Sequence, residues 1–313
     1  MPIENNYLEG IIVPMITPLK SSLELDVKGM DRLIDRMLVG GVHGIFILGT
    51  TGEASSLKPA LKKTFIETAT NEISGQVPVL VGITHTSFDV SLRMARQAKE
   101  NGATAVVAAP PYYFPLDQDD LYKYFLKLAD ASPLPLYLYN YPTMTKCTLE
   151  LETVLKLAKH NNILGVKDSS GNGVYFQKLL NLKKEFSDFT VLVGPEEITA
   201  QAVLSGADGG VNGGGNIFPS LYVRLFEAAK AKDLAMLEKI QPIILEISGN
   251  IYGCSSKSYS YFYGVKESLY YLGICEPHLA PPMLPVDSNT QEKIRENLEK
   301  IIFDIKNLGN STE

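Results

Sequence analysis

The sequence predicts an α/β protein, a (β/α)8 TIM barrel followed by a C-terminal helical extension. Short apolar runs rich in β-branched residues recur along the chain. They begin about 20 to 35 residues apart, the length of one strand with one helix. Each run is apolar on both faces, as in parallel strands covered by helices, and amphipathic stretches separate the runs. These observations together predict parallel strands connected by helices.

Eight runs are expected to form strands: Gly10–Leu19, Gly44–Gly49, Val77–Ile83, Ala105–Pro111, Leu134–Asn140, Ile163–Asp168, Phe189–Gly194 and Gly209–Asn212. The helices expected between them are Asp26–Val39, one that starts near Pro59, Ser87–Lys99, Asp117–Ala129, Leu149–Lys159, Val174–Phe186 and Ile198–Leu204. The pair Ser55-Ser56 is a candidate cap for the helix near Pro59. Gly102 is a candidate stop for the helix Ser87–Lys99.

Eight such units fit between Gly10 and about Lys232, so we expect a catalytic barrel over 1–232 and an extension over 233–313. An open, doubly wound sheet is the alternative. Its dinucleotide-binding form requires a GxGxxG turn after an early strand, and the sequence has none, which favours the barrel.

The extension is expected to be mostly helical and to pack on the barrel or on a neighbouring subunit. Pro242 is expected to kink or break its first helix. The helical stretches are Leu234–Ile247, Ser260–Leu272 and Thr290–Ile305, separated by Gly253 and the proline-rich Pro277–Pro285.

The composition argues against several classes of partner. The 313 residues carry a net charge of -6 without a basic block, so we expect no nucleic acid and no anionic membrane as a partner. No apolar run approaches the ~18 residues that span a bilayer. Residues 1–6 lack the pattern of a signal peptide, which favours a cytoplasmic protein. The three cysteines and four histidines are scattered, so we expect neither disulfides nor a metal site.

Polar residues follow the predicted strands, at the end of a barrel where chemistry takes place. Strand ends carry Gly49-Thr50-Thr51-Gly52-Glu53, Pro110-Pro111-Tyr112-Tyr113, Tyr139-Asn140-Tyr141-Pro142, Lys167-Asp168-Ser169-Ser170, Gly194-Pro195-Glu196-Glu197 and Asn212-Gly213-Gly214-Gly215. Because these ends converge, the side chains are expected to share one site.

Lys167 is the most informative of these residues. It closes an apolar strand, so its stem is expected to be buried, and desolvation lowers a lysine pKa. A neutral amine is the nucleophile that attacks a ketone to form an imine. The alternative is an ordinary ion pair between Lys167 and Asp168.

Three hydroxyls accompany the lysine. Tyr139 ends the adjacent strand, where a phenol could move protons, although a core aromatic is the alternative. Thr50 and Thr51 lie between glycines, and their hydroxyls and backbone N–H groups suit a small carboxylate or a proton relay. A simple tight turn is the alternative reading of this stretch.

Together, Gly49–Glu53, Tyr139–Pro142 and Gly165–Gly171 resemble the dihydrodipicolinate synthase/N-acetylneuraminate lyase family of Schiff-base aldolases, over nearly the whole chain. The resemblance implies a pyruvate imine on Lys167 and a second, aldehyde substrate. It also implies no metal or organic cofactor and a homotetramer built as a dimer of dimers.

The resemblance also implies roles for single residues. Tyr139 is the implied proton shuttle, Thr50 and Thr51 hold the pyruvate carboxylate, and Thr50 joins the relay. Tyr113 is implied to extend across the tight dimer interface and to join the proton relay of the neighbouring subunit. Candidate substrate contacts are Val211, through its main chain, and Ser169.

Departures from the family pattern bear on the substrate. The lysine-biosynthesis synthases place an arginine where this chain has Met144, with Lys146 nearby, and a thioether cannot replace a bidentate guanidinium. Glu196 and Glu197 resemble the acidic pair with which sialate lyases bind sugar hydroxyls, and a solvated helix N-terminus is the alternative.

The aromatic and proline-rich stretches Pro111–Pro115 and Tyr139–Thr143 look more like the 2-keto-3-deoxygluconate aldolases. The leading hypothesis is therefore a class I aldolase that reversibly cleaves a 2-keto-3-deoxy sugar acid to pyruvate and an aldehyde. The alternatives are a 4-hydroxy-tetrahydrodipicolinate synthase that uses aspartate semialdehyde, or an N-acetylneuraminate lyase. A non-catalytic binding paralogue is a further hypothesis.

Overall fold

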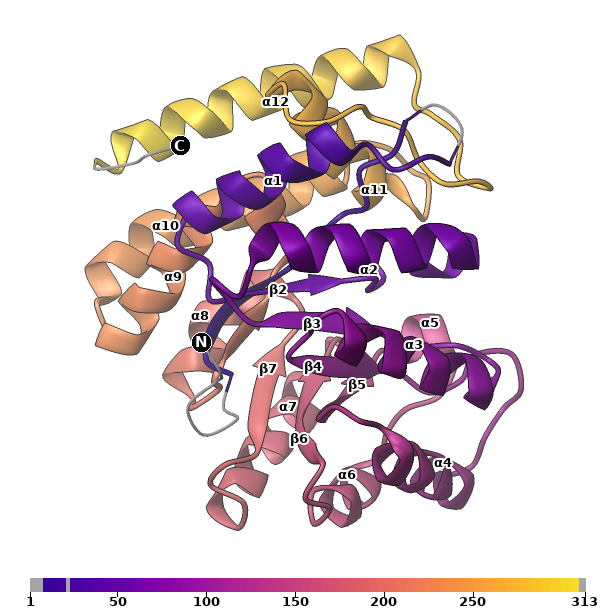
Figure 1. Ribbon diagram of the computed structural model, residues 1–313. Coiled ribbons are helices and arrows are strands. Elements are labelled where there is room, and N and C mark those ends of the chain that lie inside the picture. Colours follow the sequence, from indigo (N-terminus) through magenta and orange to yellow (C-terminus); the bar gives the residue numbers. More distant parts are fainter. Residues whose placement is uncertain (1–7, 21–22, 310–313) are drawn as a thin grey trace.

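Eight parallel strands close into a barrel in the computed structural model, which describes residues 8–20 and 23–309 (Figure 1). The strands are β1 (Gly10–Pro14), β2 (Gly44–Ile47), β3 (Val79–Gly82), β4 (Ala105–Ala108), β5 (Leu136–Asn140), β6 (Ile163–Asp168), β7 (Thr190–Val193) and β8 (Gly209–Val211). Each pairs with the next, and β1 pairs with β8. The predicted barrel is confirmed, and the open sheet is wrong. Residues 1–6, considered above for a signal peptide, lie outside the described residues.

Helical segments follow each of the eight strands, and the longer ones cover the outside of the barrel. They are α1 (Val27–Val39), η2 (Ala54–Ser56), α2 (Pro59–Ile73), α3 (Phe88–Glu100), α4 (Gln118–Ala131), α5 (Pro142–Thr145), α6 (Leu151–Leu157), α7 (Gly173–Leu180), η3 (Asn181–Lys184), η4 (Glu196–Ile198), α8 (Thr199–Leu204), η5 (Gly213–Asn216) and α9 (Pro219–Ala231). This alternation of strand and helix is the predicted one.

Apolar side chains form two layers because successive residues of a strand point to opposite faces. Ile45 and Ile47 of β2 pack between the sheet and the helices, whereas Phe46 points into the barrel. Tyr137, Tyr139, Leu192 and Val211 share that interior with Phe46. The floor of the barrel is therefore apolar and aromatic, and any polar group placed above it is poorly hydrated.

The extension contains α10 (Leu234–Glu246), a π-helical turn η6 (Ile247–Tyr252), α11 (Ser260–Tyr271) and α12 (Ser288–Asn307), which gather on one side of the barrel (Figure 1). Pro242 lies inside α10 without breaking it. Ile240, Ile243 and Ile244 around the proline are buried, and their packing holds the helix together. The expected break at Pro242 is therefore wrong, and the irregular turn comes after the helix, at η6.

Two further expectations about helix ends are corrected. The pair Ser55-Ser56 belongs to η2, while Lys58 precedes α2 without a side-chain cap, so these serines do not cap the helix. The loop after β5 forms a short helix, α5, which begins at Pro142 because proline fits the first helical position. The stop at Gly102 is confirmed, since α3 ends two residues before it.

Candidate active site

Lys167 and Tyr139 lie directly opposite each other on β6 and β5, at the carboxyl end of the barrel. The register of this pair of strands shifts near the start of β5. Without the shift Tyr139 would lie opposite Val166, whose side chain packs against the helices. The irregularity therefore brings a phenol and an amine to the same face of the sheet.

The amine of Lys167 is buried over aromatic rings. The residue is 7% exposed, and Nζ lies 4.1 Å from the centroid of the Tyr139 ring and 5.4 Å from that of Phe46. Burial lowers the pKa of Lys167 to about 7. A substantial fraction of this amine is neutral near neutral pH, which is the state a nucleophile requires.

Asp168 does not neutralise the lysine. Its carboxylate accepts hydrogen bonds from Asn140 Nδ2 at 2.8 Å and from Ser170 Oγ at 2.9 Å. Among the described residues Lys167 forms no ion pair, so the alternative of a Lys167–Asp168 pair at the strand end is wrong. Asp168 instead ties β6 to β5 through Asn140.

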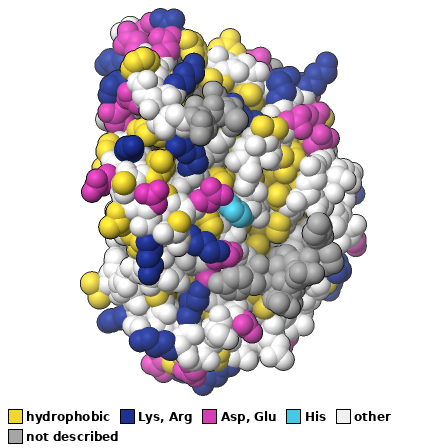
Figure 2. Space-filling view, turned by 90° about the vertical axis from the view of Figure 1, so that its left-hand side faces the viewer, with side chains coloured by type: hydrophobic (Ala, Val, Ile, Leu, Met, Phe, Trp, Pro, Cys, Tyr) yellow, Lys and Arg dark blue, Asp and Glu magenta, His cyan; other side chains and the backbone are white. Residues whose placement is uncertain are grey.

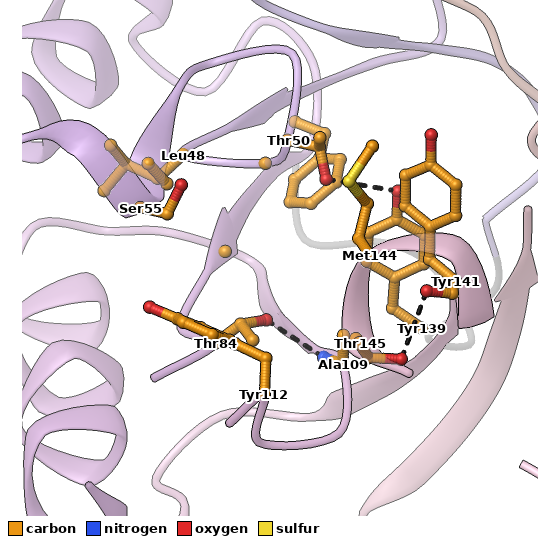
Figure 3. Close-up of a pocket in the computed structure, with 14 residues that line it drawn as sticks. Leu48, Thr50, Ser55, Thr84, Ala109, Tyr112, Tyr139, Tyr141, Met144 and Thr145 are labelled. Carbon is orange, nitrogen blue, oxygen red and sulfur yellow. Dashed lines mark hydrogen bonds between the residues drawn. The ribbon is translucent and has the colours of Figure 1, made fainter. Parts of the chain in front are cut away.

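The Tyr139 hydroxyl faces Thr50, with 3.4 Å between the two oxygens (Figure 3). Burial raises the pKa of Tyr139 to about 12, although hydrogen bonds to Thr50 and Ser169 oppose this rise. The Tyr141 ring stacks on Tyr139, with 5.6 Å between ring centroids. The phenol is thus protonated at neutral pH and held in place by its neighbours.

A cavity of about 270 Å³ opens above Lys167. The predicted site residues that line it are Lys167, Tyr139, Thr50, Thr51, Ser169, Glu196 and Val211. A side chamber of about 200 Å³ shares Thr50, Tyr139 and Met144 with it and extends toward Tyr112 (Figure 3). One lysine, several hydroxyls and the carboxylates of Glu196 and Glu197 therefore surround a space that fits a small organic acid.

The sequence analysis missed residues of the extension that line this cavity. Tyr252, Ser258, Tyr261 and Phe262 form part of its wall. The Tyr261 hydroxyl lies 3.2 Å from Thr51 Oγ1. The dense run of tyrosines and serines at 258–263 was the available signal, since such side chains suit a polar cavity better than a helix–helix contact.

The profile of the Dihydrodipicolinate synthetase family matches residues 7–301. The chain belongs to this family. A 4-hydroxy-tetrahydrodipicolinate synthase of Methanopyrus kandleri is 31% identical over 296 residues, which cover 94% of this chain and 96% of that protein. A probable 2-dehydro-3-deoxy-D-pentonate aldolase of Escherichia coli is 31% identical over 288 residues, or 91% and 94% of the two chains. A solved dihydrodipicolinate synthase from Bacteroides thetaiotaomicron is 44% identical and has a TM-score of 0.91. The match covers 94% of this chain and 98% of that chain.

Membership in the dihydrodipicolinate synthetase family confirms the resemblance drawn from the three motifs and makes the chain an enzyme of the pyruvate-dependent aldolase and lyase class. The hypothesis of a non-catalytic binding protein is set aside. The relatives carry names of different activities, so the family assignment leaves the second substrate to be argued from the site.

Glu196 differs from the rest of the cavity wall because protein groups already bind its carboxylate. The hydroxyls of Tyr222 and Tyr252 donate to Oε1, the latter at 2.6 Å, and Gly214 N–H donates to Oε2 at 3.0 Å. The residue is 5% exposed, so the alternative of a solvated helix N-terminus is wrong for it. Burial raises the pKa of Glu196. Contact of Glu196 with a substrate stays a prediction, and Glu197, which is less buried, accepts a hydrogen bond from Ser248.

Tyr113 lies apart from the other predicted site residues. It is 85% exposed, and the adjacent Phe114, whose ring meets it edge-on, is 73% exposed. The backbone φ of Tyr113 is 142°, a conformation that side chains other than glycine rarely adopt. Within one chain, Tyr113 does not take part in the Thr50–Tyr139 contact.

Two other kinds of site are not found in the part of the chain that the structure describes. No three histidine, cysteine or acidic side chains come together as metal ligands. None of the described helices has the length and apolar character needed to cross a bilayer. On the face in Figure 2, basic and acidic side chains are interspersed.

Proposed function

We propose that this enzyme is a class I aldolase that forms an imine between Lys167 and pyruvate and reversibly cleaves a 2-keto-3-deoxy sugar acid. The observation that carries this proposal is the buried amine of Lys167, 4.1 Å from the ring of Tyr139 and above an apolar barrel floor. Within the described part of the chain this amine forms no ion pair, so it is available for chemistry.

The chemistry needs only groups of this chain. Lys167 Nζ attacks the keto carbon of pyruvate, the carbinolamine hydroxyl leaves as water with a proton from the Tyr139–Thr50 relay, and a protonated imine forms. The imine withdraws electrons, so the methyl group loses a proton to the same relay and an enamine results. The enamine carbon attacks the aldehyde carbon, and the aldehyde oxygen takes up a proton from the Tyr139–Thr50 relay. Hydrolysis then releases the product and Lys167, and cleavage runs through the same steps in reverse.

The wall of the cavity favours a polyhydroxylated partner over aspartate semialdehyde. Met144 lines both chambers and is 48% exposed, and no arginine contributes to the described lining of either. Lys146 Nζ donates to Thr143 O at 2.9 Å and is turned to the surface. Tyr141, Ser258 and Glu197 contribute hydroxyl and carboxylate groups to the cavity wall, and groups of this kind suit hydrogen bonds with sugar hydroxyls.

A synthase that condenses pyruvate with aspartate semialdehyde is the second candidate. It is supported by the names of the relatives from Methanopyrus kandleri and Bacteroides thetaiotaomicron. The sugar-acid proposal is supported by the relative named a probable 2-dehydro-3-deoxy-D-pentonate aldolase. An N-acetylneuraminate lyase remains an alternative through Glu196 and Glu197.

A substrate panel tests the proposal directly. Purified enzyme is assayed with 2-keto-3-deoxy acids of five and six carbons and with N-acetylneuraminate, with released pyruvate as the readout. Condensation of pyruvate with aspartate semialdehyde is measured in parallel. We expect the highest kcat/KM with one of the 2-keto-3-deoxy acids. Efficient condensation with the semialdehyde, together with no cleavage of the sugar acids, would establish the synthase instead.

Met144→Arg is expected to improve the semialdehyde reaction and to impair sugar-acid cleavage. A charge-assisted bidentate contact contributes about 1.5–3 kcal/mol, so kcat/KM for the semialdehyde should rise roughly tenfold to a hundredfold. Met144→Leu, which preserves the volume and adds no charge, is the control and should leave the ratio of the two activities near that of the wild type. An unchanged ratio in Met144→Arg would show that this position does not select the substrate.

Imine formation is expected to accelerate as the pH rises through about 7. The pKa of Lys167 is lowered to about 7, so the reactive neutral amine predominates above that pH, and the protonated amine below it. At pH 6 the initial rate of pyruvate adduct formation should be about tenfold below its plateau. Stopped-flow or rapid-quench trapping with cyanoborohydride measures this rate. A midpoint above pH 9 would contradict a desolvated lysine.

We also propose that the enzyme is a homotetramer built from dimers in which Tyr113 completes the relay of a neighbour. Mixing Lys167→Ala with Tyr113→Phe subunits should then restore activity, because a hybrid dimer has one site with both residues intact. Sedimentation velocity should show an assembly at assay concentrations. An active monomer, or no recovery on mixing, would exclude this arrangement.

A further inference from the structure

Two adjacent threonines of the Gly49–Glu53 loop each face a different tyrosine. Thr50 Oγ1 lies 3.4 Å from the Tyr139 hydroxyl, and Thr51 Oγ1 lies 3.2 Å from the Tyr261 hydroxyl. Tyr139 comes from the barrel, whereas Tyr261 comes from the first turn of α11 in the extension. The two threonine–tyrosine pairs line the same cavity, so the loop presents two separate hydroxyl chains to one substrate.

The position of Tyr261 is fixed by close packing. Its ring meets Tyr252 at 4.7 Å between centroids, and the Tyr252 hydroxyl is bound to Glu196. The Tyr261 hydroxyl lies over Gly213, where a Cβ atom would come within 1.9 Å of it. It therefore bridges the loop after β2 and the turn after β8, and Gly213 makes room for that bridge.

A second contact joins α11 to the same loop. Lys266, on the same helix, forms an ion pair with Glu53 at 2.5 Å, and both side chains are fully buried. Ala280 N–H also donates to Glu53, at 2.7 Å. The helix that carries Tyr261 is thereby held against the loop that carries Thr51, so the distance between the two hydroxyls is set by the fold rather than by a mobile surface segment.

We propose that Tyr261 is a positioning residue for the carboxylate of the keto-acid substrate and acts by donating its hydroxyl proton to Thr51 Oγ1. A threonine hydroxyl has one proton to donate and lone pairs with which to accept. When Thr51 accepts from Tyr261, its own proton is free to point at a carboxylate oxygen, and the chain of hydrogen bonds strengthens that donation. This inference rests on the proposed function, since it assumes that pyruvate binds beside Lys167.

The surroundings of Tyr261 keep a proton on its hydroxyl that it can donate to Thr51. Burial, chiefly, and the nearby Glu196 raise the pKa of its phenol far above the ordinary value. Tyr261 thus keeps its proton near neutral pH. The two threonines of the loop then have different roles. Thr50 and Tyr139 transfer protons, whereas Thr51 and Tyr261 bind the carboxylate.

Tyr261→Phe tests the proposal because it removes only the hydroxyl. The KM for pyruvate, measured in the condensation direction, should rise roughly three- to tenfold, while kcat stays within about twofold of the wild type. Tyr270→Phe is the matched control, since Tyr270 lies on the same helix with its ring half exposed, away from the cavity. It should leave both constants unchanged.

A ketone without a carboxylate separates positioning from packing. Borohydride trapping of hydroxyacetone on Lys167 should be equal in the wild type and in Tyr261→Phe, whereas trapping at low pyruvate concentration should fall. In a Thr51→Val background, where the acceptor is absent, Tyr261→Phe should add no further increase in KM. Thermal unfolding of each variant verifies that the fold is retained.

The possible results are distinguishable. Tyr261→Phe with the wild-type KM for pyruvate overturns the inference, and so does an equal loss of pyruvate and hydroxyacetone trapping, which would indicate a packing role. Additive effects of the Thr51 and Tyr261 variants overturn it as well. A wild-type enzyme that traps no pyruvate at all would instead remove the proposed function on which the inference rests.

Discussion

Replacing Lys167 with alanine is expected to abolish the trapping of pyruvate by borohydride and to lower turnover by a factor on the order of 10⁴ or more. The imine nitrogen is Lys167 Nζ itself, and the described lining of the cavity contains no other amine. Peptide mapping of the wild type after reduction should find the pyruvate adduct on Lys167 alone.

Two further variants separate chemistry from packing. Lys167→Met keeps most of the buried volume, so a loss of trapping in this variant reflects the missing amine rather than a cavity in the core. Lys146→Ala removes an exposed lysine near Met144 and should trap pyruvate as the wild type does. An adduct that persists in Lys167→Met would place the imine elsewhere and refute the proposed mechanism.

The barrel and most of its site were predictable because they depend on local pattern. A parallel barrel must put the carboxyl ends of its strands at one mouth, so polar residues that end apolar runs meet there whatever the details of packing. Lys167, Tyr139, Thr50 and Thr51 follow from that rule, and the structure brings all four to one cavity. The residues that escaped prediction depend on contacts between distant parts of the chain.

Tyr261 and Glu196 illustrate this limit. The tyrosines and serines at 258–263 indicate a polar environment. The periodicity of α11 does not show which end of the barrel the helix crosses, so Tyr261 could not be placed in the mouth from the sequence. Glu196 looks like a free carboxylate at the end of a strand, yet Tyr222 and Tyr252, which bind it, follow 26 and 56 residues later. The register shift that places Tyr139 opposite Lys167 has no sequence signature of its own.

The substitution Tyr139→Phe is expected to slow turnover about a hundred- to ten-thousandfold, while imine formation stays detectable. Tyr139→Phe keeps the ring beneath the Lys167 amine but removes the hydroxyl that contacts Thr50. Proton transfer, rather than attack by the amine, should therefore become limiting. The readout is the exchange of the pyruvate methyl protons for deuterium, followed by NMR, alongside borohydride trapping.

The same substitution at Tyr261 serves as the contrast for Tyr139. Tyr139→Phe should lower kcat and methyl-proton exchange together while borohydride still labels Lys167, because the amine and the threonines remain. Tyr261→Phe should instead raise the KM for pyruvate and preserve exchange once pyruvate is saturating. If Tyr139→Phe exchanged methyl protons at the wild-type rate, the phenol would have no part in the relay, and a water reaching the imine through the side chamber beside Thr50 and Met144 would be the proton carrier.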